Sequence, residues 1–76
     1  MGAKYPVLPP KDVITALENF GFHYVSKKGS HMKYAKGSYV VIIPNHSEIA
    51  KGTLKSILST AHIELEEFLI NLPVPK

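Results

Sequence analysis

The spacing of apolar residues changes twice along this chain, and this change restricts the possible folds more than any other feature. Apolar residues first recur at helical spacing and stop at Gly21. From residue 22 to 43 the chain carries short runs rich in Tyr, Val and Ile, which are typical of β-strands. Helical spacing returns after Pro44.

These patterns predict an α+β fold with the element order α-β-β-β-α-α. The apolar stripes of three helices fit one face of a three-stranded antiparallel meander, so the other face of the sheet stays open. The last helix is expected to have Glu64 as its N-cap and Pro73 as its terminator. The expected elements are a helix over 10–20, strands over 22–27, 31–36 and 39–43, a helix over 51–61 and a last helix from residue 65.

Two short turns set the expected strand register. Two-residue loops at 28–29 and 36–37 would place His31 on the central strand, between Ser26 and Ile42. Period-two alternation then puts Lys33 and Tyr24 on the same open face as His31. A shift of one residue, such as a glycine bulge produces, would invert this assignment. The side chains expected to point toward the helices are those of Met32, Val25 and Val41.

The length and composition exclude several classes of protein. At 76 residues, the chain is expected to be a single domain over 1–76, with residues 1–9 as an extended, proline-rich arm. The absence of cysteine excludes a disulfide framework and a thiolate zinc site, and four scattered histidines predict neither a metal site nor a cofactor. No run approaches the roughly 18 apolar residues of a membrane span, so we expect a soluble, cytoplasmic protein.

Positive charge gathers in the middle of the chain. Residues 27–55 carry six lysines against one acid, Glu48. Because the chain has no arginine, its cations can bind phosphate as point charges but cannot make the bidentate arginine–guanine contact. Runs of like charge form ordinary solvent-exposed surfaces about as often as they form binding sites. The residues that we expect to bind a polyanion such as RNA are Lys27, Lys28, Gly29, Ser30, Lys33, Lys51 and Lys55.

His31 is the candidate catalytic residue, because an imidazole beside a turn and several lysines can move protons near neutral pH. Metal-independent RNA cleavage needs a base for the 2′-hydroxyl, positive charge for the phosphorane-like transition state and an acid for the leaving 5′-oxygen. In the expected register His46 lies about 13 Å away, at roughly 3.3 Å per residue, which is too far to share one phosphodiester. Water, Ser30 or a lysine would then assist His31. Taken alone, a strand histidine is more often structural than catalytic.

Five segments follow one another in a characteristic order: ALENFGF, KKGSHMKY, PNH, KGTLKSIL and LEEFL. They span most of residues 6–72 and resemble the HicA toxins, also called YcfA-like proteins, of bacterial and archaeal toxin–antitoxin systems. The resemblance implies a fold similar to a double-stranded-RNA-binding domain, an mRNA interferase activity and neutralisation by a HicB-type antitoxin. It also implies that His31, in the GSH motif, is catalytic and that Gly52, Thr53 and Leu54 shape the start of the second helix.

Two other functions are compatible with the same residues. A non-catalytic RNA-binding module of the double-stranded-RNA-binding type would also carry lysines at a helix start, but it has no use for an imidazole on a strand. A protein-interaction domain could use the same basic surface to bind an acidic partner. Cleavage of RNA in EDTA separates the nuclease from both, and salt-dependent RNA binding separates the two alternatives from each other.

Overall fold

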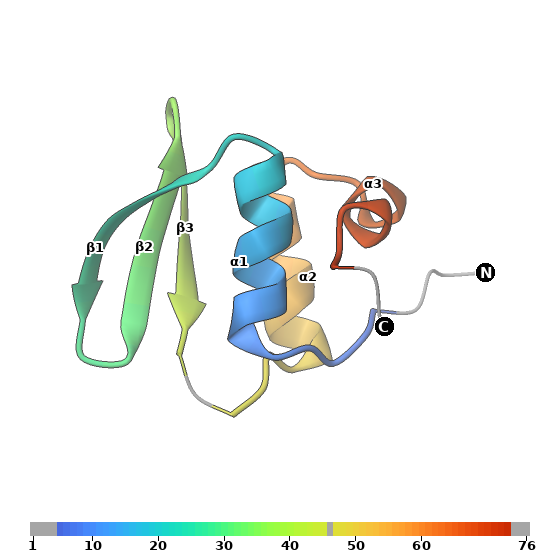
Figure 1. The fold of residues 1–76 in the computed structure, drawn as a ribbon, viewed down its shortest axis with the longest axis horizontal. Helices are drawn as coiled ribbons and strands as arrows, with labels where there is room; N and C mark the ends of the chain where they lie inside the picture. Colours follow the sequence, from blue (N-terminus) through green and yellow to red (C-terminus); the bar gives the residue numbers. More distant parts are fainter. Residues whose placement is uncertain (1–4, 46, 74–76) are drawn as a thin grey trace.

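The computed structural model describes residues 5–45 and 47–73, which form the predicted α-β-β-β-α-α order (Figure 1). Each element lies within two residues of its expected bounds. The fold is α+β, as the sequence pattern predicts, and fits the double-stranded-RNA-binding-domain-like architecture that the family resemblance implies. The elements are α1 (Pro10–Asn19), β1 (His23–Lys28), β2 (His31–Lys36), β3 (Tyr39–Pro44), α2 (Lys51–Ala61) and α3 (Leu65–Ile70).

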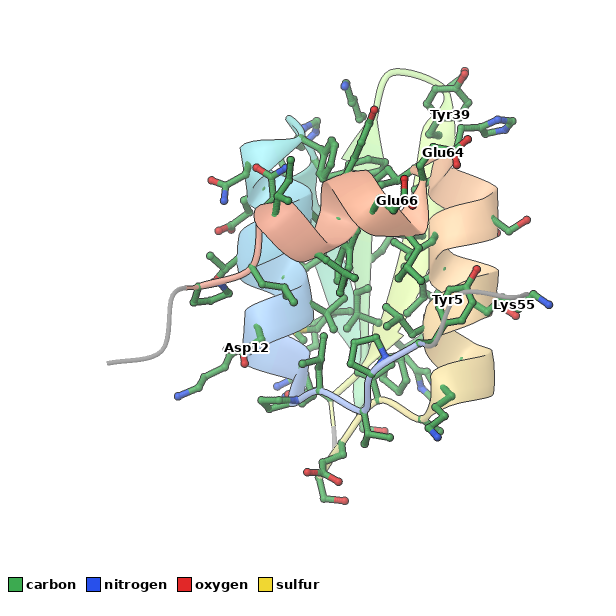
Figure 2. The ribbon with its side chains drawn as sticks, turned by 90° about the vertical axis from the view of Figure 1, so that its right-hand side faces the viewer. Tyr5, Asp12, Tyr39, Lys55, Glu64 and Glu66 are labelled. Atoms are coloured by element: carbon green, nitrogen blue, oxygen red, sulfur yellow. The ribbon has the colours of Figure 1, made fainter. Side chains whose placement is uncertain are left out.

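The helices lie on one side of the antiparallel sheet, whose strand order is β1-β2-β3. Helices α1 and α2 run beside the sheet, and α3 crosses them on the side away from the strands (Figures 1 and 2). The helix α3 therefore forms a further layer, although its apolar stripe was expected to lie on the sheet together with those of the other two helices. No helix of the described residues covers the opposite face of the sheet, as predicted.

One apolar core connects the helices with two of the strands. Burying a side chain such as Leu17, Leu54 or Phe68 contributes about 1.5–3 kcal/mol. Strand β1 adds no buried residue to this core, because all six of its residues are exposed. The core residues are Val13, Ala16, Leu17, Phe22, Tyr34, Val41, Ile43, Ile49, Leu54, Ile57, Leu58, Ala61, Leu65 and Phe68.

Both hairpin turns lie one residue later than the sequence predicted. The loops are Gly29-Ser30 and Gly37-Ser38, and each glycine has a φ of +60° at the first loop position. This is the pattern of a type II′ turn, whose first central residue is usually glycine. The expected loops at 28–29 and 36–37, with glycine in second place, were wrong. The partner of each strand residue therefore moves by two positions, which leaves every side chain on the face where it was expected unless a bulge intervenes.

The corrected register places His31 between Lys28 and Pro44, not between Ser26 and Ile42. His31 and Lys33 still lie on the open face, and Met32 and Val41 still point toward the helices, as predicted. Strand β1 differs, because Val25 forms a β-bulge between the pairs that Tyr24 and Ser26 make with β2.

The bulge moves Tyr24 to the helix-covered face, so its expected place beside Lys33 was wrong. Its ring packs edge-on against buried Tyr34, with 5.8 Å between ring centroids. Val25 was expected to face the helices, but it lies at the bulge and is exposed.

Helix α2 ends in a Schellman motif around a left-handed histidine. His62 has a φ of 60° and a ψ of 42°, and the N–H of Ile63 donates to the carbonyl of Leu58. Helix α1 ends in the same way at Gly21, where φ is +99°. A side chain in this conformation costs about 1–2 kcal/mol, whereas the His62 ring gains a contact with Tyr39, at 4.7 Å between ring centroids.

We predict that His62→Gly is more stable than His62→Ala by about 1 kcal/mol. Both substitutions remove the contact with Tyr39, but only alanine keeps a Cβ in the left-handed conformation. Urea unfolding of the two variants measures this difference. Equal midpoints, or a more stable alanine variant, would show that the left-handed backbone costs nothing here.

Candidate functional site

The open face of the sheet holds a basic pocket near the turn between β1 and β2. That turn lies at the lower end of the sheet in Figure 1. The pocket has a volume of about 490 Å³, within the range of roughly 300–1,000 Å³ typical of ligand pockets. Two lysines and a histidine line it, together with one hydroxyl and one apolar side chain. These residues, which we call the basic pocket, are Ser26, Lys28, His31, Lys33 and Ile42.

Strand pairing brings the members of the basic pocket together. Lys28 lies directly opposite His31 across the β1–β2 pair. Lys33 lies two residues further along β2, between Ser26 and Ile42. Facing side chains in such pairs have Cβ atoms about 4.5–5.5 Å apart. Lys28 and Lys33 are therefore neighbours of His31 on one face of the sheet, and none of the described residues in the lining is a carboxylate.

The Gly29-Ser30 turn holds this end of the sheet in place. A side chain at Gly29 would meet no atom within 4 Å, so the glycine is required by its φ of +60° rather than by a lack of space. The carbonyl of Ser30 accepts a hydrogen bond from the N–H of Asn45. This bond ties the segment that leaves β3 to the turn that positions His31.

The structure brings together only some of the predicted RNA-binding residues. Lys28, His31 and Lys33 share the basic pocket, with Gly29 and Ser30 in the adjoining turn. Lys27 pairs with Met32 and therefore belongs to the opposite face of the sheet. His46 lies outside the described residues, so its expected separation from His31 stays a prediction.

Lys51 and Lys55 stand apart from the basic pocket, on helix α2. That helix packs on the covered side of the sheet, and Figure 2 shows Lys55 projecting outward from it. The start of α2 and the β1–β2 turn nevertheless lie at the same end of the molecule (Figure 1). A long polyanion could reach both, whereas a single phosphate could not.

Ser26 and Ile42 line the pocket but were not among the predicted site residues. Both were expected on the open face, but neither carries charge, and only the pairing with Lys33 shows that they line the pocket. The rule that type II′ turns begin with glycine would have placed them opposite Lys33 from the sequence alone.

The chemistry of the pocket rests on an imidazole and two ammonium groups. An imidazole is a common general acid or base, and the lysines favour an anion beside it. The nearby Tyr34 faces the core, where burial raises the pKa of its hydroxyl and Glu18 and Tyr24 raise it further, so the phenol stays neutral at pH 7. Within residues 5–45 and 47–73, no three His, Asp or Glu side chains are grouped as metal ligands.

The chain matches the family model described as the HicA toxin of bacterial toxin–antitoxin systems over residues 10–63, which is more than half of its length. The matched range includes the whole sheet and every member of the basic pocket. No curated protein matches the chain. None of the helices in the described part has the length and apolar composition needed to cross a membrane.

We predict that changing Lys28 and Lys33 to glutamine weakens binding of a single-stranded RNA oligonucleotide. Two lost phosphate contacts should lower the slope of log K against log salt by about 1.4. The matched control changes Lys11 and Lys36 to glutamine, since these exposed lysines lie outside the pocket. Fluorescence anisotropy at several salt concentrations measures both variants. Equal slopes would mean that RNA binds elsewhere.

Proposed function

This chain belongs to the HicA toxin family of bacterial toxin–antitoxin systems, and on that premise we propose that it is a metal-independent endoribonuclease that cleaves mRNA. The observation that carries the proposal is that His31, Lys28 and Lys33 line one open pocket. The pocket lies on the uncovered face of the sheet, where an RNA strand can approach it. An enzyme that cleaves mRNA would act in the cytoplasm.

His31 is proposed to take the proton from the 2′-hydroxyl of the scissile nucleotide. The 2′-oxygen then attacks the neighbouring phosphorus, and the 5′-oxygen of the next nucleotide leaves. Negative charge builds up on the phosphoryl oxygens during this step, where the ammonium groups of Lys28 and Lys33 would stabilise it. No second histidine lines the pocket among the described residues, so a lysine or water is assigned to protonate the leaving oxygen.

The same pocket suits control by a partner protein. We propose that a HicB-type antitoxin covers the open face and places carboxylates where RNA phosphates would lie. Lys28 and Lys33 would then serve both the substrate and the inhibitor. A specific complex of this kind buries on the order of 1,200–2,000 Å² in total.

We predict that His31→Ala lowers the rate of RNA cleavage by about 100-fold or more in buffer that contains EDTA, because general-base catalysis contributes roughly 10²–10⁴-fold. The fold should be unchanged, since His31 is exposed. The rate is followed with an end-labelled oligonucleotide on a denaturing gel.

His23→Ala is the matched control. His23 is also exposed on the open face, but it lies opposite Ala35 at the other end of the sheet. This variant should cleave at the wild-type rate. A folded His31→Ala protein that retains wild-type activity would contradict the proposal. RNA binding by the wild-type protein without any cleavage in EDTA would favour the RNA-binding module instead.

A further inference from the structure

The two edges of the sheet differ in their chemistry. The β1 edge carries Lys27, Lys28 and the bulge at Val25, features that keep other strands from pairing with an edge. The β3 edge has the sequence YVVIIP, without charge or bulge. Within the part of the chain that the structure describes, no strand pairs with this outer edge. The protein thus protects one edge and leaves the other suited to strand pairing.

The register identifies the backbone groups that face outward from β3. In a hairpin with a two-residue loop, the pair that flanks the loop is hydrogen-bonded, and the two kinds of pair alternate from there. Lys36 and Tyr39 are that flanking pair. Val40 and Ile42 therefore direct their N–H and C=O groups away from β2, toward the free edge. Their side chains are exposed, at 43% and 45%.

A groove runs along this edge, with helix α2 as its second wall. The α2 side is formed mainly by the small hydroxyl residues Thr53, Ser56 and Thr60, which leave room for a chain beside β3. No charged side chain contributes to the groove among the described residues. Its lining residues are Val40, Val41, Ile42, Thr53, Ser56, Ile57 and Thr60.

The groove adjoins the basic pocket, since Ile42 lines both. A strand paired with β3 would extend the sheet, and its open-face side chains would stand next to Ile42. Lys33 is the neighbour of Ile42 on β2. Charge complementarity therefore favours an acidic side chain on that face of the strand, whereas the side facing α2 must be small and uncharged.

From this arrangement we propose that an extended strand of the antitoxin pairs with the free edge of β3 and reaches the basic pocket from there. This inference rests on the proposed function, because it takes the antitoxin as the partner. A second copy of this chain fits the groove less well, because pairing through its own β3 would bring its helix α2 against the α2 side of the groove. RNA is disfavoured because it lacks strand backbone groups and the groove offers it no cation.

Hydrogen exchange of the purified complex with the HicB-type antitoxin tests the pairing. The complex is made with the His31→Ala protein, which lacks the proposed catalytic residue. The exchange result therefore does not depend on whether the wild-type protein cleaves RNA. The amides of Val40 and Ile42 should gain at least about tenfold protection on complex formation. An intact complex without that gain would overturn the proposal. Equal protection from RNA alone, or from self-association alone, would also overturn it.

A second measurement compares Val40→Pro with Val40→Thr, both in the His31→Ala protein. Proline removes the outward N–H while leaving the ladder to β2, whereas threonine keeps the N–H and the branched shape. Affinity for the antitoxin should fall about tenfold or more for proline and stay within about threefold for threonine. Circular dichroism checks that both variants fold. Equal affinities of two folded variants would contradict strand pairing at this edge.

Discussion

The strand register fixed by the two Gly-Ser turns is the constraint on which the rest of the structure depends. Each turn needs a residue with φ near +60° in its first position, and Gly29 and Gly37 meet this need. The register then decides which side chains face the helices. A slip of one residue would carry His31 and Lys33 onto the core face, where burying a charge such as the Lys33 ammonium costs several kcal/mol. The basic pocket therefore follows from the turns.

Stability and the proposed activity occupy different parts of the molecule. The core connects the helices with β2 and β3, whereas β1 contributes exposed side chains alone. Lys28 and Lys33 lie on the open face, where water screens their mutual repulsion. An anion bound between them would relieve that repulsion. The open face of the sheet, which contributes little to the core, is thus the face on which a polyanion is bound most favourably.

The sequence was sufficient to predict the helices, because the spacing of apolar residues depends on local structure. Gly21 marked the end of the first helix, and Pro44 marked the end of the last strand. It also predicted correctly that His31 lies on the open face. The expected strand partners were wrong by two residues, and a shift of two residues leaves each side chain on the same face of the sheet. The bulge at Val25 was not predictable, because no glycine or proline marks it, and Tyr24 was assigned to the wrong face as a result. The separate layer formed by α3 was missed as well, because an apolar stripe does not tell which neighbour covers it. Lys51 and Lys55 were predicted to bind RNA from their charge and their place at the start of a helix, and neither property tells how far they lie from His31.

The chemical ends left by cleavage test the central claim most directly. Attack by a 2′-hydroxyl activated by His31 leaves a 2′,3′-cyclic phosphate on one fragment and a 5′-hydroxyl on the other. Mass spectrometry of an oligonucleotide cut in EDTA distinguishes these ends from those of a reaction in which water is the nucleophile. Attack by the 2′-oxygen predicts the cyclic phosphate, and no cut where the 2′-oxygen carries a methyl group. A 3′-hydroxyl with a 5′-phosphate, or cleavage of the methylated RNA, would contradict it.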